Sequence, residues 1–317
     1  MSISKNKADT LVENEGESND ELVIAASSKA CRGQAKEILE SEGEEELINF
    51  FFISVQFGNL RAVNDCLNCG ISPNIRQADT TNALHVAAEQ GNLNMGRLLL
   101  TREETDIHMK TNKGYTPLHM ACYFGKKTFV ELLLSNNANP NCETLNNRTP
   151  LHIATIRQNY EILSLLLGNS ANPNVLDSFC DTPLSNCIIR KPNFKMAALL
   201  IVDYKADTNL HCEKHMHIIL NLAQSCHTQN ELKFVQLLID NGVDYHATHP
   251  ITNKNALHFA AMTGYEPIIS LLLEYGVSTT QRDVWNRTPL QVAEQHGNEN
   301  AIDLLLAYET LQFPNKL

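Results

Sequence analysis

The sequence has no apolar run that approaches the roughly 18 residues of a membrane-spanning helix, and its first residues lack the apolar core of a secretion signal. It also lacks an excess of positive charge, because 25 lysines and arginines stand against 36 aspartates and glutamates, a formal net charge of −11. This balance argues against binding nucleic acid or acidic membranes through bulk charge. We therefore expect no membrane span and no nucleic-acid partner, and a location in the cytoplasm or the nucleus.

Signatures of catalysis are lacking as well. The chain carries no Gly-rich phosphate loop, no Gly-x-Ser-x-Gly elbow and no kinase signature. Its carboxylates are numerous, but none recurs in a pair whose placement suggests acid–base chemistry. The sequence therefore predicts a protein that is not an enzyme and that needs no cofactor.

The nine cysteines are an odd number scattered along the chain, which favours reduced thiols. Cys66 and Cys69 form a lone Cys-x-x-Cys pair, without the thioredoxin-like context or the second pair that a redox or zinc motif needs. Cys66 also aligns with the apolar positions of a predicted helix, so we expect it in the core.

What the sequence does contain is one stretch that recurs along most of its length. In the copy at residues 113–141, Thr116 can cap a helix with its hydroxyl, and Pro117 suits the first helical position. Gly125 can end that short helix at little energetic cost, because glycine readily adopts the left-handed backbone conformation. A run of leucines at 132–134 then buries a second helix, and the asparagines at 137–141 favour a turn. One such unit has too small a core to stand alone, so copies must stack.

The spacing between copies is nearly constant. Equivalent apolar positions are separated by 32 to 34 residues, except for one interval of 41 residues between Met216 and Leu257. The aligned positions are Phe51, Leu84, Leu118, Leu151, Leu184, Met216, Leu257 and Leu290. A helix-pair unit of this length that opens with Thr-Pro-Leu-His, as at residues 116–119 and 149–152, resembles the ankyrin repeat.

The resemblance covers roughly residues 47–310 and implies an all-α solenoid of about eight helix-turn-helix units joined by β-hairpin loops. It implies that the histidine of the motif is structural, its imidazole bonding to backbone. We assign that position to His85, His119, His152, His217 and His258. The resemblance also implies that the hairpin asparagines Asn141 and Asn174 are candidates for hydroxylation, with an unmodified structural asparagine as the alternative.

The remaining organisation follows from composition. Residues 1–18 are acidic and polar and are expected to form a disordered tail. Residues 19–47 have the spacing of a degenerate repeat and are expected to form a helical N-terminal cap, with residues 41–46 as an acidic link; the alternative is a helix that never docks. Residues 48–310 would then form the repeat domain and residues 311–317 a C-terminal tail.

Two copies depart from the pattern. In the fifth, Pro192 stands where the first helix should lead into the second. In the sixth, Met216 lacks the Thr-Pro signature and the second helix is expected at residues 234–240, about seven residues late. We place the extra residues in a loop at 224–230.

Histidines and cysteines cluster in the same region, at His211, Cys212, His215, His217, Cys226, His227, His246 and His249. Imidazole and thiolate are good zinc ligands, so a metal site in residues 211–249 is one alternative. Yet His215 and His217 lie only two residues apart, a spacing that suits neither one helix face nor the usual paired ligands. The preferred interpretation assigns no metal.

With no catalytic constellation, function must reside in the surface. The resemblance implies a monomeric protein–protein interaction module, an adaptor or scaffold that binds a protein partner through the concave groove of the stack. The main alternative is an inhibitor similar to the IκB proteins that masks a transcription factor, although residues 1–18 contain no Asp-Ser-Gly-x-x-Ser degron.

The family pattern also indicates which residues face the groove: those just before the helix-ending glycine and those just before Thr-Pro. Aromatic and arginine side chains at these offsets are typical of binding hot spots. The predicted partner-binding residues are Tyr115, Tyr123, Phe124, Arg148, Ile156, Arg157, Phe179, Ile189, Arg190, Trp285 and Arg287. The alternative for Tyr115 and Phe124 is that they brace neighbouring hairpins. Expected to be buried are Leu132, Leu133, Leu165, Leu166, Leu271 and Leu272.

Overall fold

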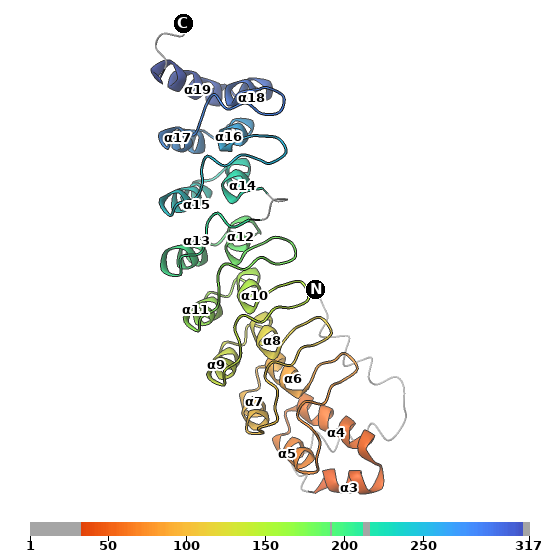
Figure 1. Cartoon of the computed structure of the whole chain (residues 1–317). Coiled ribbons are helices and arrows are strands. Elements are labelled where there is room, and N and C mark those ends of the chain that lie inside the picture. Colours follow the sequence, from red (N-terminus) through yellow and green to blue (C-terminus); the bar gives the residue numbers. More distant parts are fainter. Residues whose placement is uncertain (1–32, 191, 212–215, 313–317) are drawn as a thin grey trace. The chain divides into compact units, whose positions relative to one another are not determined.

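The computed structural model of the chain describes residues 33–190, 192–211 and 216–312. Every regular element in this described part is helical, so the predicted all-α fold class is correct (Figure 1). None of these helices is both long and apolar enough to cross a membrane. The chain divides into two compact units, Met1–Thr144 and Leu145–Leu317.

The first unit begins, in its described part, with α3 (Gln34–Ser41), which packs against α4 and α5. Helix pairs follow, and the first helices of successive pairs stack on one another, as do the second helices. The pairs are α4 (Glu44–Phe57) with α5 (Leu60–Asn68), α6 (Ala83–Gln90) with α7 (Leu93–Leu100), and α8 (Pro117–Tyr123) with α9 (Lys127–Ser135).

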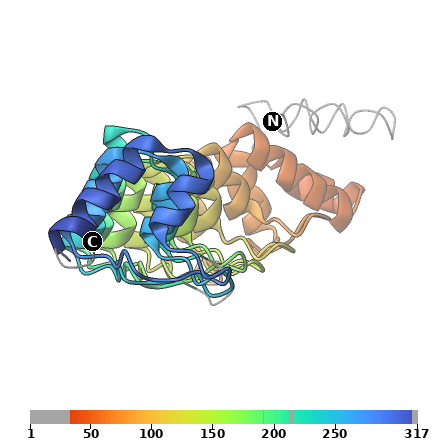
Figure 2. The same ribbon diagram turned by 90° about the horizontal axis from the view of Figure 1, so that it is seen from above.

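The second unit continues the same scheme, and its long loops gather along one side of its helices (Figure 2). Two of its elements continue into π-helical turns, Asn186–Arg190 after α12 and Leu199–Asp203 after α13. Its pairs are α10 (Pro150–Ile156) with α11 (Tyr160–Gly168), α12 (Pro183–Ser185) with α13 (Phe194–Ala198), α14 (Ile218–Ser225) with α15 (Gln229–Asp240), α16 (Ala256–Thr263) with α17 (Glu266–Glu274), and α18 (Pro289–His296) with α19 (Glu299–Gln312).

The start of the first helix is built by the predicted cap. The Thr149 hydroxyl accepts a hydrogen bond from the His152 backbone N–H, and Pro150 occupies the first turn. Asn82 and Asn255 do the same work with a side-chain oxygen in α6 and α16. Each such cap satisfies a backbone donor that the helix itself leaves unpaired.

The motif histidine connects this cap to the next repeat. In His85, Nδ1 accepts from the backbone N–H of the cap residue at 3.3 Å, which leaves Nε2 to donate to the Tyr115 carbonyl at 2.9 Å. His152 and His258 make the same pair of bonds, reaching the carbonyls of Asp181 and Arg287. All three side chains are fully buried. The predicted structural role is confirmed at these positions.

His217, however, does not occupy the motif-histidine position. It is the N-cap of α14, where its side chain accepts from the Ile219 backbone N–H. The fully buried residue Ile219, rather than the half-buried Met216, therefore corresponds to the aligned leucine, and the predicted register was wrong by three residues. Nor do the extra residues form a long loop, because α15 already begins at Gln229 and extends the second helix at its start.

At the N-terminal end, Ala35 and Ile38 of α3 are buried against α4 and α5. This shows docking for the described part of the predicted cap; residues 1–32 lie outside the described residues. The predicted acidic link was wrong for Glu44–Glu46, which form the first turn of α4, where carboxylates are favoured by the helix dipole. α4 and α19 run across the boundaries that we expected at residues 47 and 310.

Among the described residues, the loops before each first helix form tight turns without strands. Cys180 N–H donates to the Asp177 carbonyl, and Asp177 N–H to that of Asp181. The turn residues Asn147, Cys180, Asn253 and Asn286 have φ between 54° and 62°. Asparagine tolerates this left-handed conformation better than most residues.

Cys180 is disulfide-bonded, which corrects the expectation of a reduced thiol there. Cys66 is a free, fully buried thiol, as predicted.

The leucine runs are buried on one side only. Leu133, Leu166 and Leu272 are fully enclosed, but Leu132, Leu165 and Leu271 are half-buried, so that part of the expectation was wrong. The reason is the helical period: in α11 the enclosed set is Ile162, Leu163, Leu166 and Leu167, which follows a three-and-four spacing rather than a continuous run.

Leu166→Ala should lower the free energy of unfolding by about 2–5 kcal/mol, because it opens a cavity between stacked helices. The matched change Leu165→Ala, at a half-buried position of the same helix, should cost clearly less. Denaturant unfolding of both variants measures the difference. Equal losses would show that α11 is rotated relative to the arrangement described above.

A second prediction concerns pH. Burial lowers the pKa of His85, His152 and His258, and burial together with the charge of His211 lowers that of His217 to about 4. Because the folded pKa values lie below the unfolded value near 6.5, their contribution to stability is complete above pH 6.5 and is lost as pH falls below it. Each pKa unit corresponds to about 1.4 kcal/mol.

His217→Asn keeps a good cap but removes the titrating group, so its stability should fall less steeply between pH 7 and pH 4 than that of the wild type. Thermal unfolding across this range makes the measurement, with His246→Asn at an exposed position as the control. Parallel curves for wild type and His217→Asn would contradict the expectation.

Candidate functional site

The predicted partner-binding residues fall at two kinds of place, the ends of first helices and the loops that precede them. In the first unit, Phe57 is the last residue of α4 and Phe124 is the residue that follows α8, and each of these exposed aromatic residues precedes a left-handed glycine, Gly58 or Gly125. The side chains of Phe57, Tyr123 and Phe124 are 56%, 41% and 37% exposed. Tyr123 and Phe124 meet edge to face, with ring centroids 5.2 Å apart.

These helix ends lie in one row because α4, α6 and α8 stack in order. Gln90, at the end of α6, donates its side-chain amide to the Gln56 carbonyl at 2.8 Å, which fixes α6 against α4. We name the exposed side chains of Phe57, Tyr123 and Phe124 the aromatic row. Phe57 was missed because its repeat lacks Thr-Pro, yet the Phe-Gly pair that it shares with Phe124 would have revealed it.

Tyr115, in contrast, is half-buried and contributes to the structure of its own loop. Its ring lies edge-on to His119 with centroids 5.9 Å apart, and its carbonyl accepts the hydrogen bond from His85. These contacts favour the bracing role that we gave as the alternative for this residue.

In the second unit, Arg148 is held between an acid and a ring. Its Nε donates to Asp177 Oδ2 at 2.9 Å, and its guanidinium lies 5.0 Å from the centroid of the exposed Phe179 ring. Asp177 is buried, and its other oxygen accepts from the backbone N–H groups of Phe179 and Asp181. The loop thus fixes both the arginine and the aromatic residue before any partner arrives.

Arg287 and Trp285 repeat this arrangement within one loop. Arg287 donates to Asp283 Oδ2 through Nε at 3.0 Å and through Nη2 at 2.7 Å, and its guanidinium lies 4.7 Å from the Trp285 ring centroid. Burial alone would raise the pKa of Asp283, but hydrogen bonds from Arg287 and from backbone N–H groups lower it overall. The Trp285 side chain is 59% exposed.

Apolar residues at the tips of the loops were missed by the sequence analysis. Leu145, Ile251 and Val284 are all well exposed. Neighbouring tips are tied together, since the Ser178 N–H donates to the Asn146 carbonyl and the Val284 N–H to the Thr252 carbonyl, each at 3.0 Å. The signal was available, because each apolar residue stands inside a turn where polar residues are the rule.

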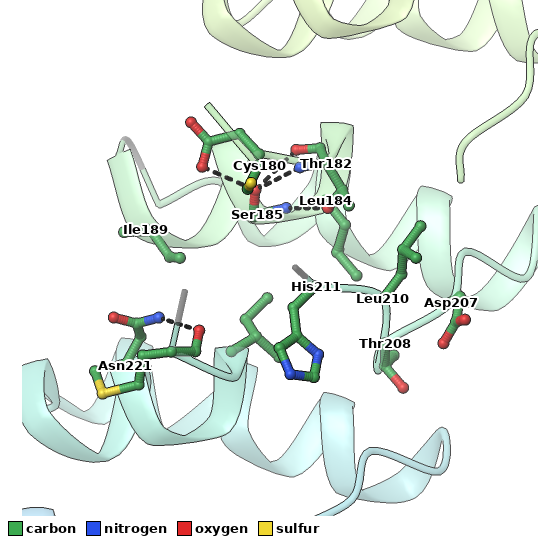
Figure 3. A pocket seen from close by; sticks show the side chains of 13 residues that line it. Cys180, Thr182, Leu184, Ser185, Ile189, Asp207, Thr208, Leu210, His211 and Asn221 are labelled. Carbon is green, nitrogen blue, oxygen red and sulfur yellow. Dashed lines mark hydrogen bonds between the residues drawn. The ribbon is translucent and has the colours of Figure 1, made fainter. Parts of the chain in front are cut away.

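The other predicted residues differ in exposure. Ile156 is half-buried, Arg157 is exposed, and the side chain of Arg190 lies outside the described residues. Ile189 lines a cavity of about 40 Å³ between α12 and α14 and faces Asn221 across it (Figure 3). Ligand pockets span about 300–1,000 Å³, so this space suits a water molecule rather than a substrate.

In the histidine-rich region, the rings of His211 and His217 meet edge to face with centroids 4.9 Å apart. His211 is exposed and its Nδ1 lies 2.7 Å from the Asn209 carbonyl, while His217 Nε2 lies 3.2 Å from Asn209 Oδ1. Within the described ranges, no three His, Cys, Asp or Glu side chains are grouped so as to hold a metal ion. Cys212 and His215 lie outside the described residues.

The side chains of the hairpin asparagines hydrogen-bond to backbone N–H groups and so stabilise the loops. Asn174 Oδ1 accepts from the Asp207 backbone N–H of the following repeat at 2.8 Å, and Asn209 does the same for Asp244 at 2.7 Å. Asn139 Oδ1 accepts from the Asn141 backbone N–H at 2.9 Å. Hydroxylation of Asn141 or Asn174 stays a prediction.

The family model for ankyrin repeats (3 copies) matches residues 51–144, 127–212 and 221–315. These matches cover well over half of the 317 residues, so the chain belongs to the ankyrin repeat family. Ankyrin repeats generally mediate protein–protein interaction and are typically non-catalytic.

Individual relatives match over short segments. The chain is 40% identical over 63 residues to delta-latroinsectotoxin-Lt1a of Latrodectus tredecimguttatus and 36% identical over 78 residues to protein phosphatase 1 regulatory subunit 12A of Mus musculus. The matches cover 20% and 24% of this chain, but only 5% and 8% of those proteins. Among solved structures, the ankyrin repeat domain of Bcl-3, described as a unique member of the IκB protein family, matches with TM-score 0.63 and 26% identity, over 72% of this chain and 99% of that one.

Asp283→Asn should lower the free energy of unfolding by about 1–3 kcal/mol, because the new amide cannot accept every bond that the buried carboxylate accepts from Arg287 and the backbone. Denaturant unfolding measures the loss. Asp303→Asn, which makes the same change at an exposed position of α19, should be nearly neutral. A neutral Asp283→Asn would mean that the loop does not depend on this acid.

Proposed function

We propose that this protein is a non-enzymatic protein–protein interaction module that acts as an adaptor or scaffold and binds its partner through first-helix ends and hairpin loops. The observation that carries the proposal is the aromatic row of the first unit, Phe57, Tyr123 and Phe124. Exposed aromatic side chains bury a large apolar area at little entropic cost when a partner covers them, and they are enriched among binding hot spots.

The second unit supports the same function through arginine side chains rather than through a row of aromatic ones. Arg148 and Arg287 are each held by a buried aspartate and covered by an exposed ring, so their positions are fixed in the free protein. A side chain that is already ordered loses less entropy on binding, which favours affinity. Phe179 and Trp285 present the rings that a partner would contact.

A second candidate function is that of an inhibitor similar to the IκB proteins, which would mask a transcription factor. The likeness to the ankyrin repeat domain of Bcl-3 favours it. The two functions differ in the partner: an inhibitor should abolish DNA binding by a captured transcription factor in a gel-shift assay, whereas an adaptor should leave the activity of its partner intact.

We further propose that the protein is a monomer that resides in the cytoplasm, with the nucleus as the second location, and that it does not bind nucleic acid. The partner-binding role of the residues named above, Tyr115 excepted, belongs to the same proposal, as does a repeat domain that begins with α4 and ends with α19. Light scattering at micromolar concentration tests the monomeric state directly.

Replacing the aromatic row, as Phe57→Ser/Tyr123→Ser/Phe124→Ser, should weaken partner binding by about 2 kcal/mol or more, close to thirtyfold in Kd. Affinity purification with mass spectrometry identifies a protein captured by the wild-type chain, and titration of that protein measures Kd for both chains. The exposed side chains contribute little to folding, so Tm should change little.

The matched control is Val202→Ser/Leu306→Ser/Leu311→Ser, which removes exposed apolar side chains from other helices. If this control weakens binding as much as the row variant, apolar exposure alone is responsible. If the row variant binds normally, the aromatic row is not the binding face, and if the wild type captures nothing, the proposed function is wrong.

A further inference from the structure

Lys254 is an unusual residue in the second unit. It precedes the cap of α16, it is only 9% exposed, and its Nζ lies 3.3 Å from Met262 Sδ. Two aromatic rings lie farther from the ammonium, since Nζ is 5.7 Å from the centroids of both Phe259 and Trp285. Within the described residues, no carboxylate forms an ion pair with it.

The one nearby acid is already occupied. Asp283 accepts from two backbone N–H groups with Oδ1 and from Arg287 with Oδ2, so its oxygens are committed to that loop. Burial, and then the charge of Arg287, lower the pKa of Lys254. His249 faces the same Phe259 ring, but its Nδ1 accepts backbone hydrogen bonds from Ile251 and Thr252. Among the described residues, Asp283 is the acid that acts on Lys254, and it is also paired with Arg287, so the two cations outnumber it.

The loop that leads to Lys254 and the loop beside it carry exposed apolar residues. Ile251 and Val284 are 78% and 56% exposed, and Trp285 stands beside them. The two loops that carry these residues are joined by the hydrogen bond from Val284 to Thr252, so they present one surface. An ammonium that is partly desolvated beside rings binds an anion more strongly than one that is fully hydrated.

We propose that the loops at residues 249–254 and 283–287 form a docking site for an acidic segment of a protein partner. A carboxylate of the segment pairs with the Lys254 ammonium, and a neighbouring aliphatic side chain packs on Trp285 and Val284. This inference rests on the proposed function, to which it adds a chemical class of partner.

A protein segment fits better than a nucleic acid. Ile251 and Val284 offer aliphatic contacts that match leucine-like side chains, which a phosphate backbone does not supply. The two occupants can be separated in one assay, because an oligothymidylate would stack on Trp285 without any carboxylate.

The assay uses an internal probe, since Trp285 is the only tryptophan of the chain. The intact protein is titrated with a short peptide in which aspartate alternates with leucine, and Trp285 emission is followed. We expect a saturable blue shift, and no shift with the matched peptide that carries asparagine in place of aspartate. Lys254→Met keeps the apolar stem but removes the charge, and should raise Kd about tenfold or more.

Lys233→Met, which removes a charge from an exposed position of α15, should leave Kd unchanged. The inference is overturned if the aspartate peptide gives no shift, if Lys254→Met binds it as tightly as the wild type, or if oligothymidylate produces the stronger shift. The proposed function is judged separately: a partner captured by the wild type that binds Lys254→Met normally ends the docking proposal alone, since protein binding itself is retained.

Discussion

The structure depends on the hydrogen bonds of a buried imidazole. In His85, His152 and His258 one nitrogen accepts from the cap of its own helix and the other donates to the carbonyl of the next loop. The ring thus fixes the helix start, the angle of the following loop and the distance between neighbouring repeats at the same time. The exposed side chains of the loops therefore have fixed positions, because the loop backbone is hydrogen-bonded to the buried imidazole.

Much of this fold could be predicted from the sequence. Thr-Pro-Leu-His specifies a cap, a first turn, a core residue and the bridging histidine in four consecutive positions, and each of these assignments is realised at residues 149–152. The assignment was wrong where the Thr-Pro-Leu-His motif is missing. In α14 a histidine takes over the cap, so an alignment on His217 shifted the register by three residues, and only the burial of Ile219 reveals the correct one.

The candidate site was less predictable, for a physical reason. Offsets within the repeat identify which positions face outward, and Tyr123, Phe179 and Trp285 are indeed exposed. The position of a residue within the repeat does not predict which other residues its side chain contacts. That Arg287 is held by Asp283, that Tyr115 is used to brace its loop, and that Lys254 has no acidic partner in the described residues all depend on contacts between separate segments.

The imidazole bonds also give the stack a direction. Each one reaches from a helix to the loop that follows it in the chain, so the donor belongs to the earlier repeat and the acceptor to the later one. Removing a later repeat takes the acceptor from an imidazole N–H, whereas removing an earlier repeat takes the donor from a loop carbonyl. Within either unit, the two ends left by shortening therefore differ in chemistry: a C-terminal cut exposes an imidazole donor and an N-terminal cut exposes a carbonyl acceptor.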